Sequence, residues 1–153
     1  MITAVAAAAF VAGEIQAQDT PKSVWDGVYT EAQAERGKAG YATSCAMCHA
    51  PDLSGGGEAP ALAGAAFLSS WNGQPVGDLF ERIHTTMPIQ APGSLEPAAY
   101  ADIVAFLFKT NGFPAGQADL ANAKEMLTGI RIDAAKPGAV APPVAEGAQT
   151  PPK

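Results

Sequence analysis

The pentapeptide Cys45-Ala46-Met47-Cys48-His49 constrains this chain more than any other feature of its sequence. The spacing C-x-x-C-H is the sequence form of covalent haem attachment. Two thiols separated by two residues can add to the two vinyl groups of one haem, and the adjacent histidine can then supply a nitrogen ligand to the iron. Cys45 and Cys48 are the only cysteines in the sequence, so no other disulfide or metal framework can claim them. The motif therefore predicts one covalent haem c with His49 as an iron ligand.

Two other interpretations of the cysteine pair are weaker. A redox-active disulfide would need a thioredoxin-like βαβ pattern, which the sequence does not show. A zinc site would need four ligands, and the one full set is Cys45, Cys48, His49 and His84. Adjacent Cys48 and His49 are poorly placed to bind one zinc ion, and His84 has no ligand-pair spacing with another histidine. Haem attachment is the better interpretation.

The second axial ligand of the iron has four candidates, which are Met47, His84, Met87 and Met126. Met47 lies between the attachment cysteines and cannot reach the opposite face of the haem, and Met126 lies far along the chain. Met87 follows a predicted helix and precedes Pro88, where a loop could press its thioether against the iron. A His/Met pair favours Fe(II) and raises the potential. We expect Met87 to be the ligand and His84 to be a partly exposed polar residue; ligation by His84 when Met87 is displaced is the alternative.

The first 17 residues differ from the rest of the chain. Residues 1–13 form an apolar run that is too short to span a bilayer comfortably, and small and polar residues follow it. This pattern predicts a secretory signal peptide over residues 1–17, cleaved near Ala17, and a periplasmic mature protein with no stable membrane span. No lysine or arginine precedes the apolar run, which leaves open an upstream start or an uncleaved anchor.

The charge of the chain limits its partners. The formal net charge is −6 at pH 7, and no stretch resembles a basic phosphate-binding stripe. Nucleic acid is therefore excluded as a partner. An acidic surface favours a basic docking partner or simply keeps the protein soluble.

The first helix is expected over residues 31–44. Thr30 has the position of an N-cap, and Gln33 would complete a capping box by reaching back to it. Gly37 and Gly40 lie inside this helix and lower its intrinsic stability. We therefore expect another segment to pack closely against the face that carries these glycines.

Two further helices are expected from hydrophobic periodicity. An apolar stripe predicts a helix over residues 76–85, which must end before Pro88. The strongest pattern predicts a helix over residues 97–110, with Pro97 at its first position and Gly112 just beyond its end. The core is expected to be small and helical.

The remaining segments carry weaker signals. Residues 45–68 are rich in glycine and proline and are expected to be loop-like, a short helical turn is expected near residues 121–127, and no strand pattern is visible. The expected organisation is a signal peptide (1–17), an N-terminal leader (18–29), a haem domain (30–113), a C-terminal extension packed on that domain (114–133) and a disordered Pro/Ala-rich tail (134–153).

These segments together resemble class I cytochromes c, and most of all the small cytochrome modules found with periplasmic quinoprotein dehydrogenases. The resemblance covers residues 24–132. It rests on six blocks in order, which are SVWDGVYTEAQAERG, CAMCH, APALAG, FLSSWNG, LFERIHTTMP and YADIVAFLFKTNGFP. It implies an all-α cytochrome c fold, with three to four short helices and loops wrapped around one covalent haem.

The resemblance also implies roles for single residues at the haem. Cys45 and Cys48 would form the thioether bonds, and His49 and Met87 would be the proximal and distal iron ligands. The Pro60 carbonyl would accept a hydrogen bond from His49, which would fix the tautomer of the ring and strengthen it as a donor to the iron.

Other roles implied by the resemblance concern packing. Leu62 would lie against the haem, and Trp71 would reach a haem propionate through its indole N–H. Gly37 and Tyr100 would lie where the first and last helices cross. His84 departs from similar sequences, which more often have arginine at its position, and nothing in the family corresponds to the C-terminal tail.

The expected function is electron transfer in a respiratory chain, without catalysis. An iron whose axial positions are filled by His49 and Met87 has no open position for a substrate. The protein would carry single electrons from a dehydrogenase, such as a quinoprotein dehydrogenase, or a quinol-oxidising complex to a terminal acceptor such as an oxidase. The alternatives are a haem c subunit of a larger dehydrogenase, and a gas sensor or peroxidase if Met87 is not a stable ligand.

Overall fold

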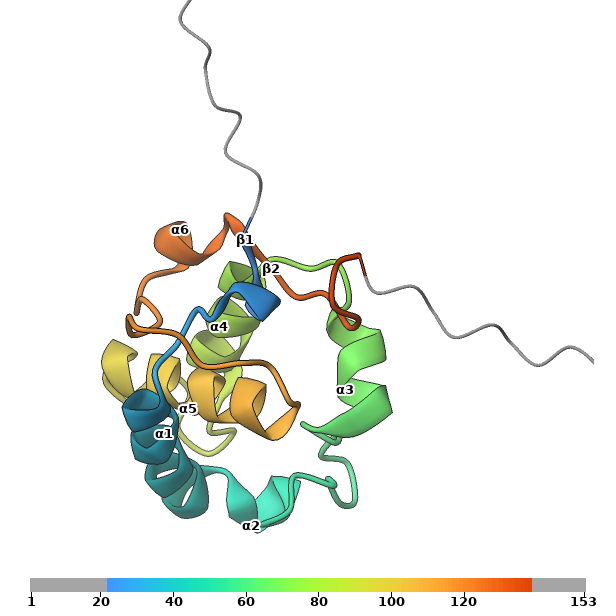
Figure 1. Cartoon of the computed structure of the whole chain (residues 1–153). Helices are drawn as coiled ribbons and strands as arrows, with labels where there is room; N and C mark the ends of the chain where they lie inside the picture. The colour runs from blue at the N-terminus through green and yellow to red at the C-terminus, as the bar shows by residue number, and fades with distance from the viewer. Residues whose placement is uncertain (1–21, 139–153) are drawn as a thin grey trace, which may run out of the picture.

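The computed structural model describes residues 22–138, so the expected signal peptide, the first four residues of the leader and most of the tail lie outside the described residues. The elements are β1 (Lys22–Ser23), the 3-10 helix η1 (Val24–Asp26), α1 (Glu31–Ser44), α2 (Ala46–His49), α3 (Gly64–Trp71), α4 (Val76–Thr86), α5 (Pro97–Thr110), α6 (Lys124–Leu127) and β2 (Ile130–Arg131). Residues 22–138 are mostly helical, as expected, but they form six α-helices where three to four were expected (Figure 1). No helix between residues 22 and 138 is long and apolar enough to cross a membrane.

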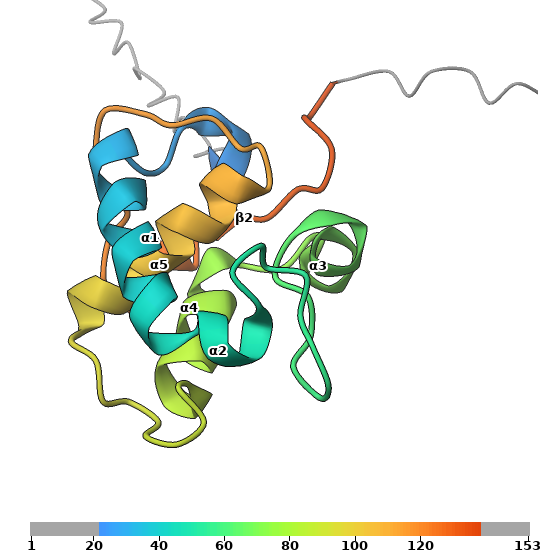
Figure 2. The same cartoon turned by 90° about the horizontal axis from the view of Figure 1, so that it is seen from below.

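Helices α1 and α5 lie side by side and cross each other (Figures 1 and 2). A methyl group added at Gly37 of α1 would overlap the backbone oxygen of Asp102 in α5, so the two helices touch backbone to backbone at this glycine. At Gly40 the nearest atoms would be those of the Ile103 side chain, at 3.5 Å. The close packing expected from these glycines is confirmed.

The start of α1 is partly as expected. The Thr30 side chain accepts a hydrogen bond from the Gln33 backbone N–H at 3.1 Å, which confirms the N-cap. The second half of the expected capping box is wrong, because the Gln33 side chain turns inward and is 2% exposed. Its amide donates to the Leu120 carbonyl at 3.0 Å and accepts from the Leu120 N–H at 2.6 Å. A polar side chain on a buried face is thus paired with the C-terminal extension.

Two helices lie where a loop was expected. The single-turn helix α2 contains most of the C-x-x-C-H motif, and α3 covers eight residues. Helix α3 has no capping side chain of its own, but the Asn111 side chain at the end of α5 accepts from the Gly64 N–H at 2.9 Å. The accepting side chain lies 47 positions away from Gly64 along the chain. The local sequence therefore contains no capping signal for α3, and the helix was not predicted.

The N-terminal leader and the C-terminal extension pack against each other. Strand β1 pairs in parallel with β2, and Trp25 donates from its indole nitrogen to the Asp133 carbonyl at 2.8 Å. The extension also reaches the loop between α3 and α4, where the Ile132 N–H donates to the Gln74 carbonyl at 2.9 Å. The expectation of no strands is wrong, because strands of two residues show no alternating pattern. Both terminal segments belong to the packed body of the described chain.

Candidate haem-binding site

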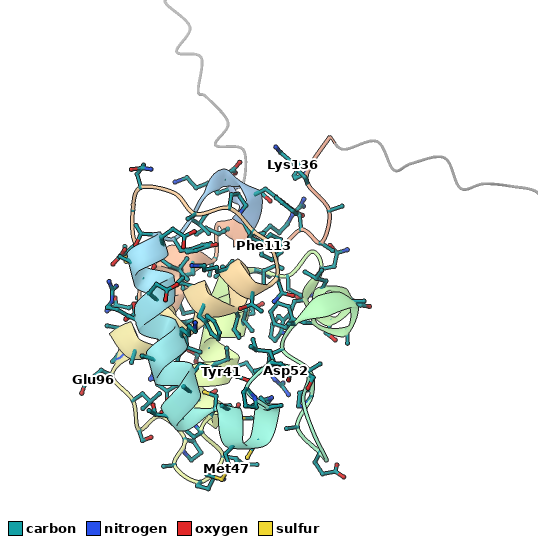
Figure 3. All side chains as sticks on the ribbon, turned by 60° about the horizontal axis from the view of Figure 1, so that its bottom comes forward. Tyr41, Met47, Asp52, Glu96, Phe113 and Lys136 are labelled. Carbon is teal, nitrogen blue, oxygen red and sulfur yellow. The ribbon has the colours of Figure 1, made fainter. Side chains whose placement is uncertain are left out.

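One open cavity of about 840 Å³ brings all the sequence-predicted site residues together. Its walls come from α1, α2, α3, α4, α5 and the loops between them, and two of its lining residues, Tyr41 and Met47, are labelled in Figure 3. The predicted residues that line it are Cys45, Cys48, His49, Pro60, Leu62, Trp71 and Met87. A volume of this size lies in the range of about 300 to 1,000 Å³ found for ligand and cofactor sites.

The cysteines lie one helical turn apart at the start of α2. The Cys48 and His49 N–H groups both donate to the Cys45 carbonyl, at 3.2 and 3.0 Å, which closes the turn. Both thiols are free, Cys45 is half-buried and Cys48 is exposed. Burial, with a smaller contribution from Cys48, raises the pKa of the Cys45 thiol to about 11. A pair of free thiols on one cavity wall suits double thioether attachment to one haem.

His49 is held in one orientation by the loop that follows α2. The residue is 8% exposed, and its Nδ1 lies 2.8 Å from the Pro60 carbonyl oxygen. Because a carbonyl can only accept, Nδ1 carries the proton and Nε2 is left with a free lone pair. The loop can approach because Gly55 has a φ of +78° and lacks a side chain; a methyl group there would lie 2.6 Å from the Ala59 oxygen.

Met87 caps the C-terminal end of α4 and its backbone is fixed on several sides. Its N–H donates to the Ile83 carbonyl at 2.9 Å, which ends the helix. Its own carbonyl accepts from the Tyr100 hydroxyl at 2.7 Å and from the Gly93 N–H at 3.3 Å. Tyr100 therefore links α5 directly to the residue predicted as the distal ligand.

The side walls of the cavity are mainly apolar. Leu62 and Trp71 are half-buried, and the Leu62 carbonyl accepts from the Asn111 side chain at 3.1 Å. Sequence analysis did not single out the other wall residues, which include Tyr41, Leu79, Ile83, Ile103 and Leu107. Four of these five belong to the apolar stripes of α4 and α5. Those stripes predicted buried helix faces, but not that the faces would line a cavity. Arg82 and Glu58 also line the cavity, and nothing in the sequence pattern indicated either.

Two of the other candidate ligands, His84 and Met126, lie outside the cavity. The His84 ring packs edge-on against Tyr100, with ring centroids 5.1 Å apart, and does not line the cavity. Met126 is on α6 and does not line the cavity either. In the described part of the chain, no three His, Cys, Asp or Glu side chains are grouped to hold a metal ion, so the four-ligand zinc set does not assemble.

The donor set in this cavity fits haem c. Two free thiols for attachment, one imidazole nitrogen with a free lone pair and one thioether face a common space with apolar walls. These are the groups that covalent attachment and His/Met ligation require.

One known protein family matches the part of the chain that forms the cavity. The family model of cytochrome c oxidase, cbb3-type, subunit III matches residues 32–107, a range that includes the C-x-x-C-H motif and Met87. Among solved structures, the chain is similar to the crystal structure of the sulfane dehydrogenase SoxCD from Paracoccus pantotrophus, with 22% identity and a TM-score of 0.46 over 83% of this chain and 67% of that chain. No curated protein sequence matches significantly. The chain thus carries a class I cytochrome c domain whose cofactor is one covalently bound haem c.

Proposed function

We propose that this protein carries single electrons in the periplasm, with its haem c attached to Cys45 and Cys48 and ligated by His49 and Met87. When bound, the haem supplies reversible one-electron chemistry. The observation that carries the proposal is the placement of all four residues on one cavity, with Nε2 of His49 free and the Met87 backbone held by Tyr100.

The chain's own residues would tune the site. The Pro60 carbonyl keeps the proton on Nδ1 of His49 and makes Nε2 a stronger donor. The apolar walls, with Leu62 among them, exclude water and so favour the less charged, reduced state. Trp71 would contribute its indole N–H to a propionate.

The proposed partners are redox proteins. The donor would be a dehydrogenase or a quinol-oxidising complex, and the acceptor would be a terminal oxidase. The matching family is named for a subunit of a terminal oxidase, which supports this class of partner. Export to the periplasm would be accompanied by cleavage near Ala17, so N-terminal sequencing of the mature protein should begin at Gln18.

The test is an absorption spectrum of protein expressed in a host with cytochrome c maturation, oxidised and then reduced with and without CO. We expect a covalent haem spectrum, a Met-to-iron band in the oxidised protein and no change with CO. Met87→Ala should lose the band and bind CO. Met126→Ala, which changes an exposed methionine outside the cavity, should behave as wild type.

Three results would contradict the proposal. CO binding by the wild-type protein would favour a sensor or a peroxidase. A Met-to-iron band that survives Met87→Ala would assign the distal position to another residue. No covalent haem at all would refute the whole assignment.

A further inference from the structure

The negative charge of the described chain is concentrated in one segment. Residues 45–96 contain five carboxylates and a single cation, Arg82. Residues 22–44 and 97–138 together contain seven acidic and seven basic side chains. The five carboxylates are Asp52, Glu58, Asp78, Glu81 and Glu96. The segment that forms most of the cavity therefore supplies the whole net negative charge of residues 22–138.

Ion pairs sharpen this asymmetry. The ion pairs among residues 22–138 join Arg36, Lys109 and Arg131 to carboxylates outside the 45–96 segment. None of the five carboxylates of that segment takes part in these pairs. Their charge is not neutralised by a neighbour, so it acts on an approaching molecule.

Exposed apolar side chains lie in the same region. Met47 on α2 is 93% exposed and Ile89, in the loop after α4, is 69% exposed. Both line the cavity, as does the exposed Glu58. Figure 3 shows Met47, Asp52 and Glu96 in the half of the molecule opposite Lys136. An apolar centre with charged residues at its edge is the common anatomy of a protein interface.

We propose that this mouth face, defined as Met47, Ile89 and Glu58 at the rim of the cavity, docks a redox protein whose own contact surface is apolar at its centre and rich in lysine or arginine at its edge. The inference rests on the proposed electron transfer through the haem. Charge complementarity selects a basic partner, because an acidic partner or a second copy would place carboxylates against carboxylates. Such docking over a small surface is weak and brief.

The location is tested by NMR on the haem-loaded protein, labelled with ¹⁵N and titrated with an unlabelled, lysine-rich cytochrome c as the probe. We expect amide shifts to cluster at Met47, Glu58 and Ile89 and to disappear when the salt concentration is raised. An acidic cytochrome c should produce no such cluster. Shifts centred on α6 or on β1 and β2, or shifts that persist at high salt, would overturn the proposal.

The charge is tested by the rate at which the reduced protein gives one electron to tris(phenanthroline)cobalt(III), a cation, or to hexacyanoferrate(III), an anion. At an ionic strength of about 10 mM, where screening is weak, Glu58→Lys should slow the reaction with the cation and speed that with the anion, each at least about threefold. Glu125→Lys makes the same change in net charge on exposed α6, far from α2 (Figure 1), and should change both rates much less.

The contribution of the exposed apolar side chains is tested by a pair of matched substitutions. Ile89→Ser should weaken binding of the basic cytochrome c, whereas Met126→Ser, at an equally exposed position, should not. If Glu58→Lys and Glu125→Lys change the rates equally, only net charge matters and the mouth face is not the docking site. Failure of electron transfer itself would be seen separately, as a protein that neither reagent oxidises.

Discussion

Replacement of Gly37 by alanine tests the central helix crossing. The added methyl group would overlap the Asp102 carbonyl oxygen and lie 3.0 Å from the Ile103 nitrogen. Both are backbone atoms of α5, so no side-chain rotation can relieve the overlap and the two helices must separate. Gly40→Ala is the matched control in the same helix, because its methyl group would meet only the Ile103 side chain, at 3.5 and 3.6 Å.

The two substitutions should change the free energy of unfolding in opposite directions. Alanine in place of glycine stabilises a helix by about 1 kcal/mol, and this gain applies at both positions. Overpacking costs about 1 to 3 kcal/mol or more, and at Gly37 it acts on backbone in the closest helix contact. We expect the cost at Gly37 to lie at the top of this range, so Gly37→Ala should destabilise the protein by about 2 kcal/mol after this gain. Gly40→Ala should stabilise it by about 0.5 to 1 kcal/mol.

The assay is chemical and thermal unfolding of the haem-loaded proteins, followed by circular dichroism. Since about 1 kcal/mol moves the Tm of a domain of this size by several degrees, the two variants should melt on opposite sides of wild type. A Gly37→Ala protein that melts at or above the wild-type temperature would refute the backbone contact. Equal shifts of the two variants would refute the assignment of the crossing to Gly37.

Three other substitutions probe contacts described above. Tyr100→Phe removes the hydroxyl that donates to the Met87 carbonyl. Imidazole should therefore replace Met87 on the iron, and abolish the Met-to-iron band, at a concentration about two to ten times lower than in wild type. Burial, with a contribution from a nearby carboxylate, raises the pKa of Tyr29 from 10 to about 12. The resulting stability is complete below pH 10 and is lost as the pH rises to 12, so the denaturant midpoint should fall over that interval, and less steeply in Tyr29→Phe. Gln33→Leu leaves both backbone groups of Leu120 without their partner and should cost about 2 to 4 kcal/mol in chemical unfolding.

Each of these has a clear contrary outcome. An unchanged imidazole titration in Tyr100→Phe would mean that the hydroxyl does not hold the Met87 backbone. An equal loss of stability between pH 10 and 12 in wild type and Tyr29→Phe would assign the titration to other groups. A Gln33→Leu protein as stable as wild type would show that water replaces the lost amide.

The three long helices were predictable because their signals are local. Thr30 supplies a cap to the N–H three residues later, and Pro97 has the fixed φ that suits a first helical turn. The expected ranges 31–44 and 97–110 match α1 and α5, and α4 extends one residue beyond its expected range. The C-x-x-C-H motif is equally local, and the haem cofactor that it predicted is confirmed by the family match.

The features that the sequence did not reveal depend on residues far apart in the chain. Gln33 pairs with Leu120 across 87 positions, and a local capping box was the nearest partner that sequence alone could offer. The start of α3 depends on Asn111, and β1 and β2 are too short to carry a period. Arg82 lines the cavity because of the way in which α4 is oriented against the rest of the fold, which the local sequence does not specify. In each case tertiary contact overrides local preference.

The parallel pairing of β1 with β2 also determines where the domain can be attached to something larger. Both ends of the described chain leave from the end of the molecule that carries this pairing, whereas α2 lies at the opposite end (Figures 1 and 3). A partner domain joined close to either of these two points would attach on the side of the molecule away from α2. On a flexible linker attached there, the domain would be able to contact a donor and an acceptor in turn. The length of the linker would then set the effective concentration of each partner at the cavity mouth.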